Sequence, residues 1–133
     1  MKNLYRCIVL IVPFFLFGCG ESHESLANDL NEELHQLALI LVDIKGPNAA
    51  TMFRDSKGEI EDIGEEIQSI VAKVNSLEKP TLEETKKIGE INRGSDSPMI
   101  RIRKQMTRLK GLPGGYAFTS EVNRLALEHL QKL

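Results

Sequence analysis

The sequence predicts an all-α fold, an antiparallel bundle of about four helices that follows a short apolar N-terminal segment. Apolar residues recur every three or four positions in several segments, and no segment alternates apolar and polar residues as a half-buried strand does. Aromatic residues make up only 5% of the chain, and tryptophan is absent. A core of leucine, isoleucine, valine and alanine is more typical of packed helices than of a β-sandwich.

The first helix is expected at about residues 26–45. Its apolar residues are spaced by three or four positions, which places them on one face. They are Leu26, Leu30, Leu34, Leu37, Leu41 and Ile44. Ser25 is the expected N-cap, and Gly46 followed by Pro47 is the expected end.

The second helix is expected to be long, at about residues 48–78. Its apolar face repeats with the same spacing over Ala49, Phe53, Ile60, Ile63, Ile67, Ile70, Val74 and Leu77. Gly58 weakens this helix because glycine has a low helix propensity. After "EKPT", Thr81 and Glu84 have the spacing of a capping box for the next helix.

Residues 82–110 allow two interpretations. The segment "RGSDSP" (93–98) contains residues that interrupt helices, and Ser97 with Pro98 fits the N-cap and the first position of a new helix. The alternative is a single helix that is kinked at Pro98.

A last helix is expected at about residues 120–132. The segment "GLPGGY" (111–116) predicts a break before it, and Thr119 or Ser120 is the expected N-cap.

The first 18 residues have the layout of a signal peptide. Lys2 and Arg6 give a positive start, and an apolar block follows at residues 7–17. A membrane-spanning helix needs about 20 apolar residues, so this block is too short to be one. Residues 1–18 are therefore predicted to be cleaved.

The end of this block, Leu16-Phe17-Gly18-Cys19, resembles the lipobox of bacterial lipoprotein precursors. The resemblance implies cleavage after Gly18 and attachment of diacylglycerol to Cys19. Phe17 departs from the pattern, in which a small or β-branched residue is commoner. Gly20 in place of Asp implies the outer membrane, facing the periplasm. The alternative is a free cysteine at the end of an ordinary signal peptide.

This interpretation divides the chain into three parts. Residues 1–18 form a cleaved lipoprotein signal peptide, residues 19–25 form the acylated cysteine with a short polar tether, and residues 26–133 form the helical domain. Two or more acyl chains hold a protein stably on a membrane, so a lipid-modified Cys19 would be a lasting anchor.

The chain also resembles small uncharacterised bacterial lipoproteins. The likeness rests on the Cys-Gly start, the "SHES" opening, a leucine-rich helix with the ending "ILVDIK", and the "NAATM" turn that opens the next helix. It covers residues 1 to about 82. Such proteins have no established activity, so the resemblance implies a location and helical content but no reaction.

A few residues have side chains that could bind a metal ion or haem. Glu32 and His35 lie one helical turn apart, but di-iron bundles use that pair twice and the second copy is missing. Axial haem ligands could come from Met52, Met99, Met106, His35 and His129. The preferred interpretation is that Glu32 and His35 face solvent and that Met99 and Met106 fill the core. No cofactor or metal is therefore expected.

Two charged runs lie in different predicted helices. The acidic run comprises Glu59, Glu61, Asp62, Glu65 and Glu66, and the basic run comprises Arg101, Arg103, Lys104, Arg108 and Lys110. We expect solvated faces that complement each other across the bundle. The alternative for the basic run is contact with anionic lipid headgroups or cell-wall polymer. The formal net charge of −2 argues against a nucleic-acid-binding protein.

The sequence contains no nucleophile elbow, phosphate-binding loop or zinc signature, and no catalytic residue is predicted. The expected function is that of a membrane-anchored envelope lipoprotein, a non-enzymatic interaction or structural module with an envelope protein as its partner. The alternative is a four-helix carrier of a cofactor, metal or small ligand in the periplasm.

The anchor is tested by replacing its acceptor thiol. We expect Cys19→Ser to abolish incorporation of labelled palmitate and to leave the unprocessed precursor, because the hydroxyl is not the acceptor of the lipid. Cys7→Ser, inside the signal, should leave labelling unchanged. Equal labelling of the wild type and the Cys19→Ser variant would refute the lipoprotein interpretation.

Overall fold

The computed structural model describes residues 21–94 and 96–133, and every regular element in these ranges is helical. The α-helices are α2 (His23–Asp43), α3 (Ala49–Ser76), α4 (Leu82–Ile91), α5 (Pro98–Lys110) and α6 (Gly115–Leu125). Two 3₁₀ segments, η1 (Gly46–Asn48) and η2 (Leu127–Lys132), complete the set. The predicted all-α class is confirmed. No helix within the described ranges is both long and apolar enough to cross a bilayer.

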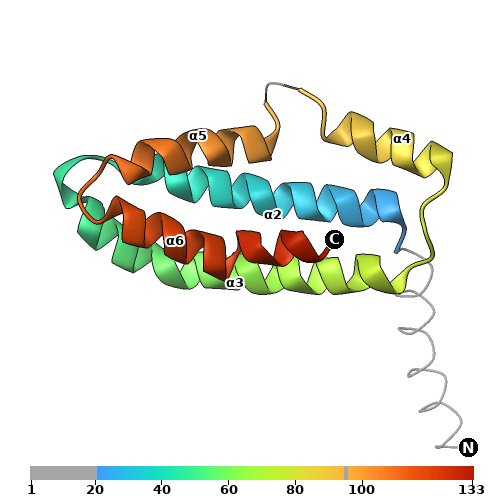
Figure 1. Ribbon diagram of the computed structural model, residues 1–133, viewed down its shortest axis with the longest axis horizontal. Helices are drawn as coiled ribbons and strands as arrows, with labels where there is room; N and C mark the ends of the chain where they lie inside the picture. The colour runs from blue at the N-terminus through green and yellow to red at the C-terminus, as the bar shows by residue number, and fades with distance from the viewer. Residues whose placement is uncertain (1–20, 95) are drawn as a thin grey trace, which may run out of the picture.

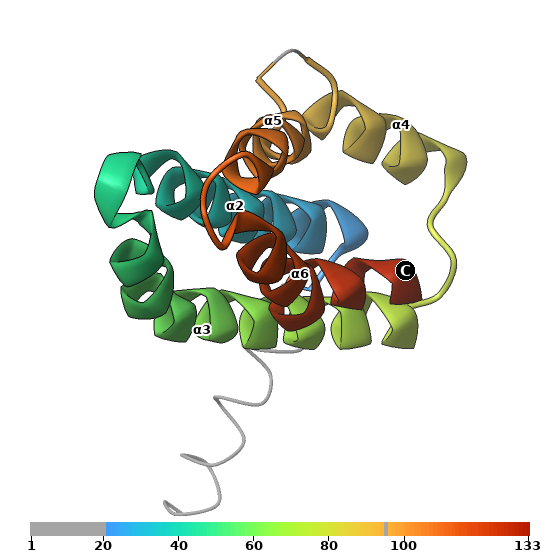
Figure 2. The same cartoon turned by 60° about the vertical axis from the view of Figure 1, so that its left-hand side comes forward.

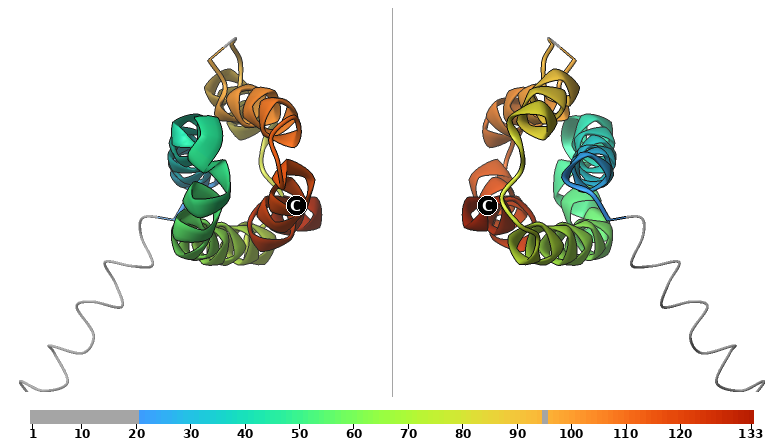
Figure 3. Two further views of the ribbon diagram at one scale, coloured as in Figure 1. Left: turned by 90° about the vertical axis from the view of Figure 1, so that its left-hand side faces the viewer. Right: turned by 90° about the vertical axis from the view of Figure 1, so that its right-hand side faces the viewer.

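The helices enclose one core (Figures 1 and 2). α2 packs against α3 and α5, α6 packs against α3 and α5, and η2 packs against α3 and α6. The end-on views show these helices as a ring around the core, with α4 in line with α5 (Figure 3). α4 packs against α2. The pairs α2/α3 and α5/α6 run antiparallel, whereas the neighbours α2 and α5 run in the same direction (Figure 1).

The buried face of α2 follows the predicted spacing. Leu26, Leu34, Leu37, Leu41 and Ile44 are buried, and Leu30 is partly buried. The helix begins earlier than expected, because Ser22 rather than Ser25 is its N-cap: the Ser22 hydroxyl oxygen accepts a hydrogen bond from the Ser25 amide at 3.1 Å. Residues 23–25, which we expected in the tether, therefore belong to α2.

The prediction of one long second helix is confirmed by α3, which Gly58 does not interrupt. Gly64, in the middle of α3, is buried against the end of α6. A Cβ atom at Gly64 would lie 1.9 Å from the carbonyl oxygen of Leu125, so only glycine allows this approach. Near the other end of the same interface, the rings of Phe53 and Phe118 stack with centroids 4.0 Å apart.

The region 82–110 forms two helices, so the interpretation as one kinked helix is wrong. α4 ends at Ile91, and Gly94 then takes a positive φ of 136° that helical residues do not adopt. Pro98 opens α5 with Ser97 at the N-cap, as predicted.

The predicted capping box at the start of α4 is confirmed. The Thr81 hydroxyl accepts from the Glu84 amide at 3.2 Å, and the Glu84 carboxylate accepts from the Thr81 amide at 2.7 Å. The hydrogen bond from the Thr81 backbone holds the pKa of the Glu84 carboxyl below its ordinary value.

The predicted last helix at 120–132 is present, but it begins earlier than expected and is not one continuous α-helix. α6 begins at Gly115 and ends at Leu125, after which the chain continues as η2. Gly114 adopts a left-handed φ of 76° at the N-cap, and a Cβ at Gly115 would lie 1.8 Å from the Leu109 carbonyl oxygen. The two glycines therefore close a compact turn, and Thr119 lies buried inside α6 instead of capping it.

We expect Gly64→Ala to lower the free energy of unfolding by about 1–3 kcal/mol, because the added methyl group must displace the α6 backbone. Gly58→Ala in the same helix is the matched control, since a Cβ there meets nothing within 4 Å. The control should raise stability by about 0.5–1 kcal/mol. Urea unfolding followed by circular dichroism measures both, and equal effects would contradict the proposed contact.

Candidate functional site

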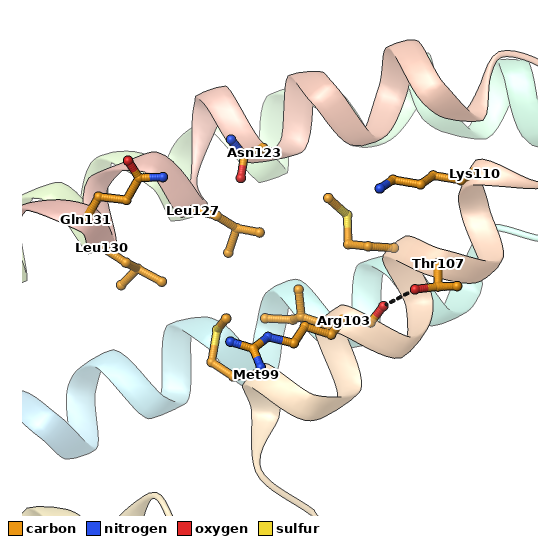
Figure 4. A pocket seen from close by; sticks show the side chains of 10 residues that line it. Met99, Arg103, Thr107, Lys110, Asn123, Leu127, Leu130 and Gln131 are labelled. Atoms are coloured by element: carbon orange, nitrogen blue, oxygen red, sulfur yellow. Dashed lines mark hydrogen bonds between the residues drawn. The ribbon is translucent and has the colours of Figure 1, made fainter.

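The strongest candidate site is a groove between α5 and the arm formed by α6 and η2. α5 packs against α6, but in the described part of the chain η2 packs only against α3 and α6. A hollow of about 620 Å³ therefore opens between α5 and η2. We call it the α5–η2 groove (Figure 4). Its lining residues are Met99, Ile102, Arg103, Met106, Thr107, Lys110, Asn123, Leu127, Leu130 and Gln131.

The floor of the groove is apolar and comes from both sides. Met99, Ile102 and Met106 are spaced by three and four positions, so they lie on one face of α5. Leu127 and Leu130 face them from η2 (Figure 4). Ile102 is fully buried, whereas the other four floor residues pack against the core and remain partly exposed.

The rim of the groove is polar and positively charged. Arg103 and Lys110 stand on the α5 side, and the amide side chains of Asn123 and Gln131 lie on the opposite side (Figure 4). No acidic residue is among the groove-lining residues. Between described residues, no ion pair involves Arg103 or Lys110.

The groove continues towards the start of α6. A second hollow of about 330 Å³ shares Met106, Lys110 and Asn123 with the first. It adds Tyr116, whose side chain is highly exposed, together with Thr119 and Ser120. The two hollows therefore adjoin each other along α5.

The other three residues of the basic run, Arg101, Lys104 and Arg108, do not line the groove. Arg108 has a structural role. The Arg108 guanidinium donates to the carbonyl oxygens of Leu41 at 2.8 Å and Ile44 at 2.9 Å. These carbonyls lie at the C-terminal end of α2, where the helix dipole favours a positive charge. Arg101 and Lys104 are exposed.

The acidic run lies on the exposed face of α3. We expected it to complement the basic run, but no ion pair between described residues joins the two. Glu33 of α2 lies close enough to Glu66 of α3 to be repelled by it, so the acidic surface extends to α2. Partial burial, followed by repulsion from Glu66 and from Glu32 and Asp29, raises the pKa of the Glu33 carboxyl. The domain thus has an acidic α2–α3 side and a cationic groove elsewhere.

The structure separates the residues considered for metal or haem binding. Glu32 and His35 are exposed, as the preferred interpretation predicted. In the described ranges, no group of three or more histidine, cysteine or acidic side chains is arranged to hold a metal ion. Met99 and Met106 both line the groove, whereas Met52, His35 and His129 do not. The Nδ1 atom of His129 is buried without a hydrogen-bond partner in the described structure.

A smaller hollow of about 180 Å³ lies beneath α4. Leu26, Leu30, Leu34, Val74, Ile88 and Leu133 supply most of its apolar lining, and His23, Asn31 and Asn92 stand among them. The His23 ring nitrogen Nε2 lies 2.6 Å from the Glu78 carbonyl oxygen. This contact ties the start of α2 to the segment that leads into α4.

The sequence pattern assigned Met99, Ile102 and Met106 to the core and did not indicate a groove. The sequence pattern does not show the path of residues 126–133. Leu127 and Leu130 reach the groove because they lie on the 3₁₀ segment η2 and not on a continuation of α6. The predicted lipidation site, Cys19, lies outside the described residues.

Comparison with known proteins gives no relative. No family model, no curated protein and no solved structure matches the chain.

The Arg108 contacts predict a specific loss of stability. We expect Arg108→Ala to lower the free energy of unfolding by about 1–3 kcal/mol, because two backbone carbonyls lose a charged donor. Lys104→Ala, which removes an exposed charge from the same helix, should change it by less than about 0.5 kcal/mol. Urea unfolding compares the two, and equal losses would show that Arg108 contributes only its charge.

Proposed function

We propose that the chain is an envelope lipoprotein, anchored by lipid on Cys19, whose helical domain binds a partner protein through the α5–η2 groove. It acts as a non-enzymatic interaction module. The observation that carries this proposal is the groove itself, in which a partly exposed apolar floor lies beneath two cations without an ion-pair partner among the described residues.

The floor favours a partner because apolar surface gains free energy when it leaves water. Met99 and Met106 on α5 and Leu127 and Leu130 on η2 make up the partly exposed floor, and such clustered apolar surface is typical of binding grooves. Methionine side chains adapt to the shape of a partner, so two of them in one groove suit binding better than rigid internal packing.

The position of the predicted anchor is compatible with an open groove. α2 begins at His23, only four positions after Cys19, so an anchor there would hold the N-terminal end of α2 close to the bilayer. The groove is lined by residues of α5, α6 and η2, and no residue of α2 lines it. In this arrangement the groove faces the periplasm if the lipid inserts in the outer membrane.

A carrier function is the second candidate, and the hollow beneath α4 favours it. The hollow is lined mainly by aliphatic side chains. Its volume of about 180 Å³ is below the roughly 300–1,000 Å³ typical of ligand sites, so it suits only a small apolar ligand. Native mass spectrometry of the purified chain would reveal such a ligand as a constant added mass.

Crosslinking in native membranes tests the proposed function. A photoreactive residue at Thr107, on the groove rim, should yield a discrete adduct with one envelope protein. The same residue at Glu61, on the acidic face of α3, should not. Met106→Glu should reduce the Thr107 adduct at least about tenfold, because a carboxylate would have to be buried in the floor. Adducts of equal yield at both positions, or none at Thr107, would contradict the proposal.

A further inference from the structure

We infer that the partner segment in the α5–η2 groove is an acidic amphipathic α-helix of another envelope protein. This inference rests on the proposed function and specifies the chemistry of the partner. It combines the length of the groove, the sign of its charge and the way in which its floor is exposed.

The length of the groove fits a short helix. Its wall on α5 extends from Met99 to Lys110, which at about 1.5 Å per residue corresponds to roughly 16 Å, or three helical turns. A helix that docks in a groove places apolar side chains at positions i, i+3 or i+4, and i+7 along such a strip. Met99, Ile102 and Met106 present apolar side chains at the same intervals.

The charge of the rim selects an acidic helix. Arg103 and Lys110 flank the apolar floor, and none of the groove-lining residues is acidic. Acidic residues beside the apolar face of a docked helix would meet these two cations. The full chain carries a formal charge of −2, and α3 has an acidic face, so an anionic helix would be repelled there and attracted to the cations of the groove.

A small amphipathic molecule fits the groove less well. Such ligands bury about 70–90% of their surface in a concave site. Among the residues that line this groove, only Ile102 is fully buried, and the rim residues Arg103, Lys110, Asn123 and Gln131 are exposed. A helix brings its own apolar face and covers Met99 and Met106 from above without needing an enclosed cavity.

A second copy of the chain also fits poorly. The acidic helices that it could offer are α2 and α3, but the apolar faces of both are already buried in its own core. On α2 the exposed large apolar residues are Leu39 and Val42, which span less than one helical turn and cannot cover a groove three turns long. An occupant of the groove must present acidic and apolar residues together, so the partner is a different chain.

The test uses the full-length lipoprotein in phosphatidylcholine nanodiscs and two labelled peptides of about 14 residues. One peptide has leucine on one helical face and glutamate elsewhere, and the other has lysine in place of glutamate. Fluorescence anisotropy, with empty nanodiscs subtracted, should show that the glutamate peptide binds at least about tenfold more tightly. The double variant Arg103→Glu/Lys110→Glu should reverse this order.

The double variant Arg101→Glu/Lys104→Glu is the matched control. It changes the net charge of α5 by the same amount but leaves the groove lining intact, so the glutamate peptide should keep its preference. Oleate, added in place of a peptide, probes the alternative of a small amphipathic ligand. The inference is overturned if the control variant also comes to prefer the lysine peptide, or if the wild type binds the two peptides equally. It is also overturned if oleate binds and neither peptide does. The anchor and the crosslinked partner are measured separately, by palmitate labelling and the Thr107 adduct, so their failure is distinguishable from failure of the inference.

Discussion

The burial of the apolar stripe of α2 is the constraint on which the rest of the structure depends. Leu37 and Leu41 are completely buried, and α2 packs against α3, α4 and α5. Each such leucine contributes about 1.5–3 kcal/mol when its side chain leaves water. α4 shows this dependence most clearly, since it has no buried residue of its own and packs only against α2 among the described elements.

The groove follows from how the other two helices are attached to this pair. Arg108 fastens α5 to the C-terminal end of α2, and Gly64 allows α6 to approach α3 closely. The α5 and α6 helices meet near the glycine turn at Gly114 and Gly115, but they are then held by different partners. η2 therefore packs against α3 and not against α5, which leaves the groove between α5 and η2.

The parts of this fold that the sequence predicted are those controlled by local spacing and capping. The stripes of α2 and α3 have one periodicity along their whole length, and the Thr81–Glu84 box is a local contact, so both were recognisable. The start of α6 was missed because it depends on the close contact of Gly115 with Leu109, which spacing alone does not show. The site was missed for a related reason: Met106 has the same periodicity whether it is covered or lines a groove.

The α5–η2 groove is the proposed binding surface of the domain. Its most direct test is NMR of the chain with ¹³C-labelled methionine methyl groups during addition of the glutamate peptide. Met99 and Met106 line the groove, whereas Met52 lies outside it and serves as an internal reference. The account predicts that the Met99 and Met106 signals shift while the Met52 signal stays in place. Unchanged signals from Met99 and Met106, or equal shifts of all three, would contradict it.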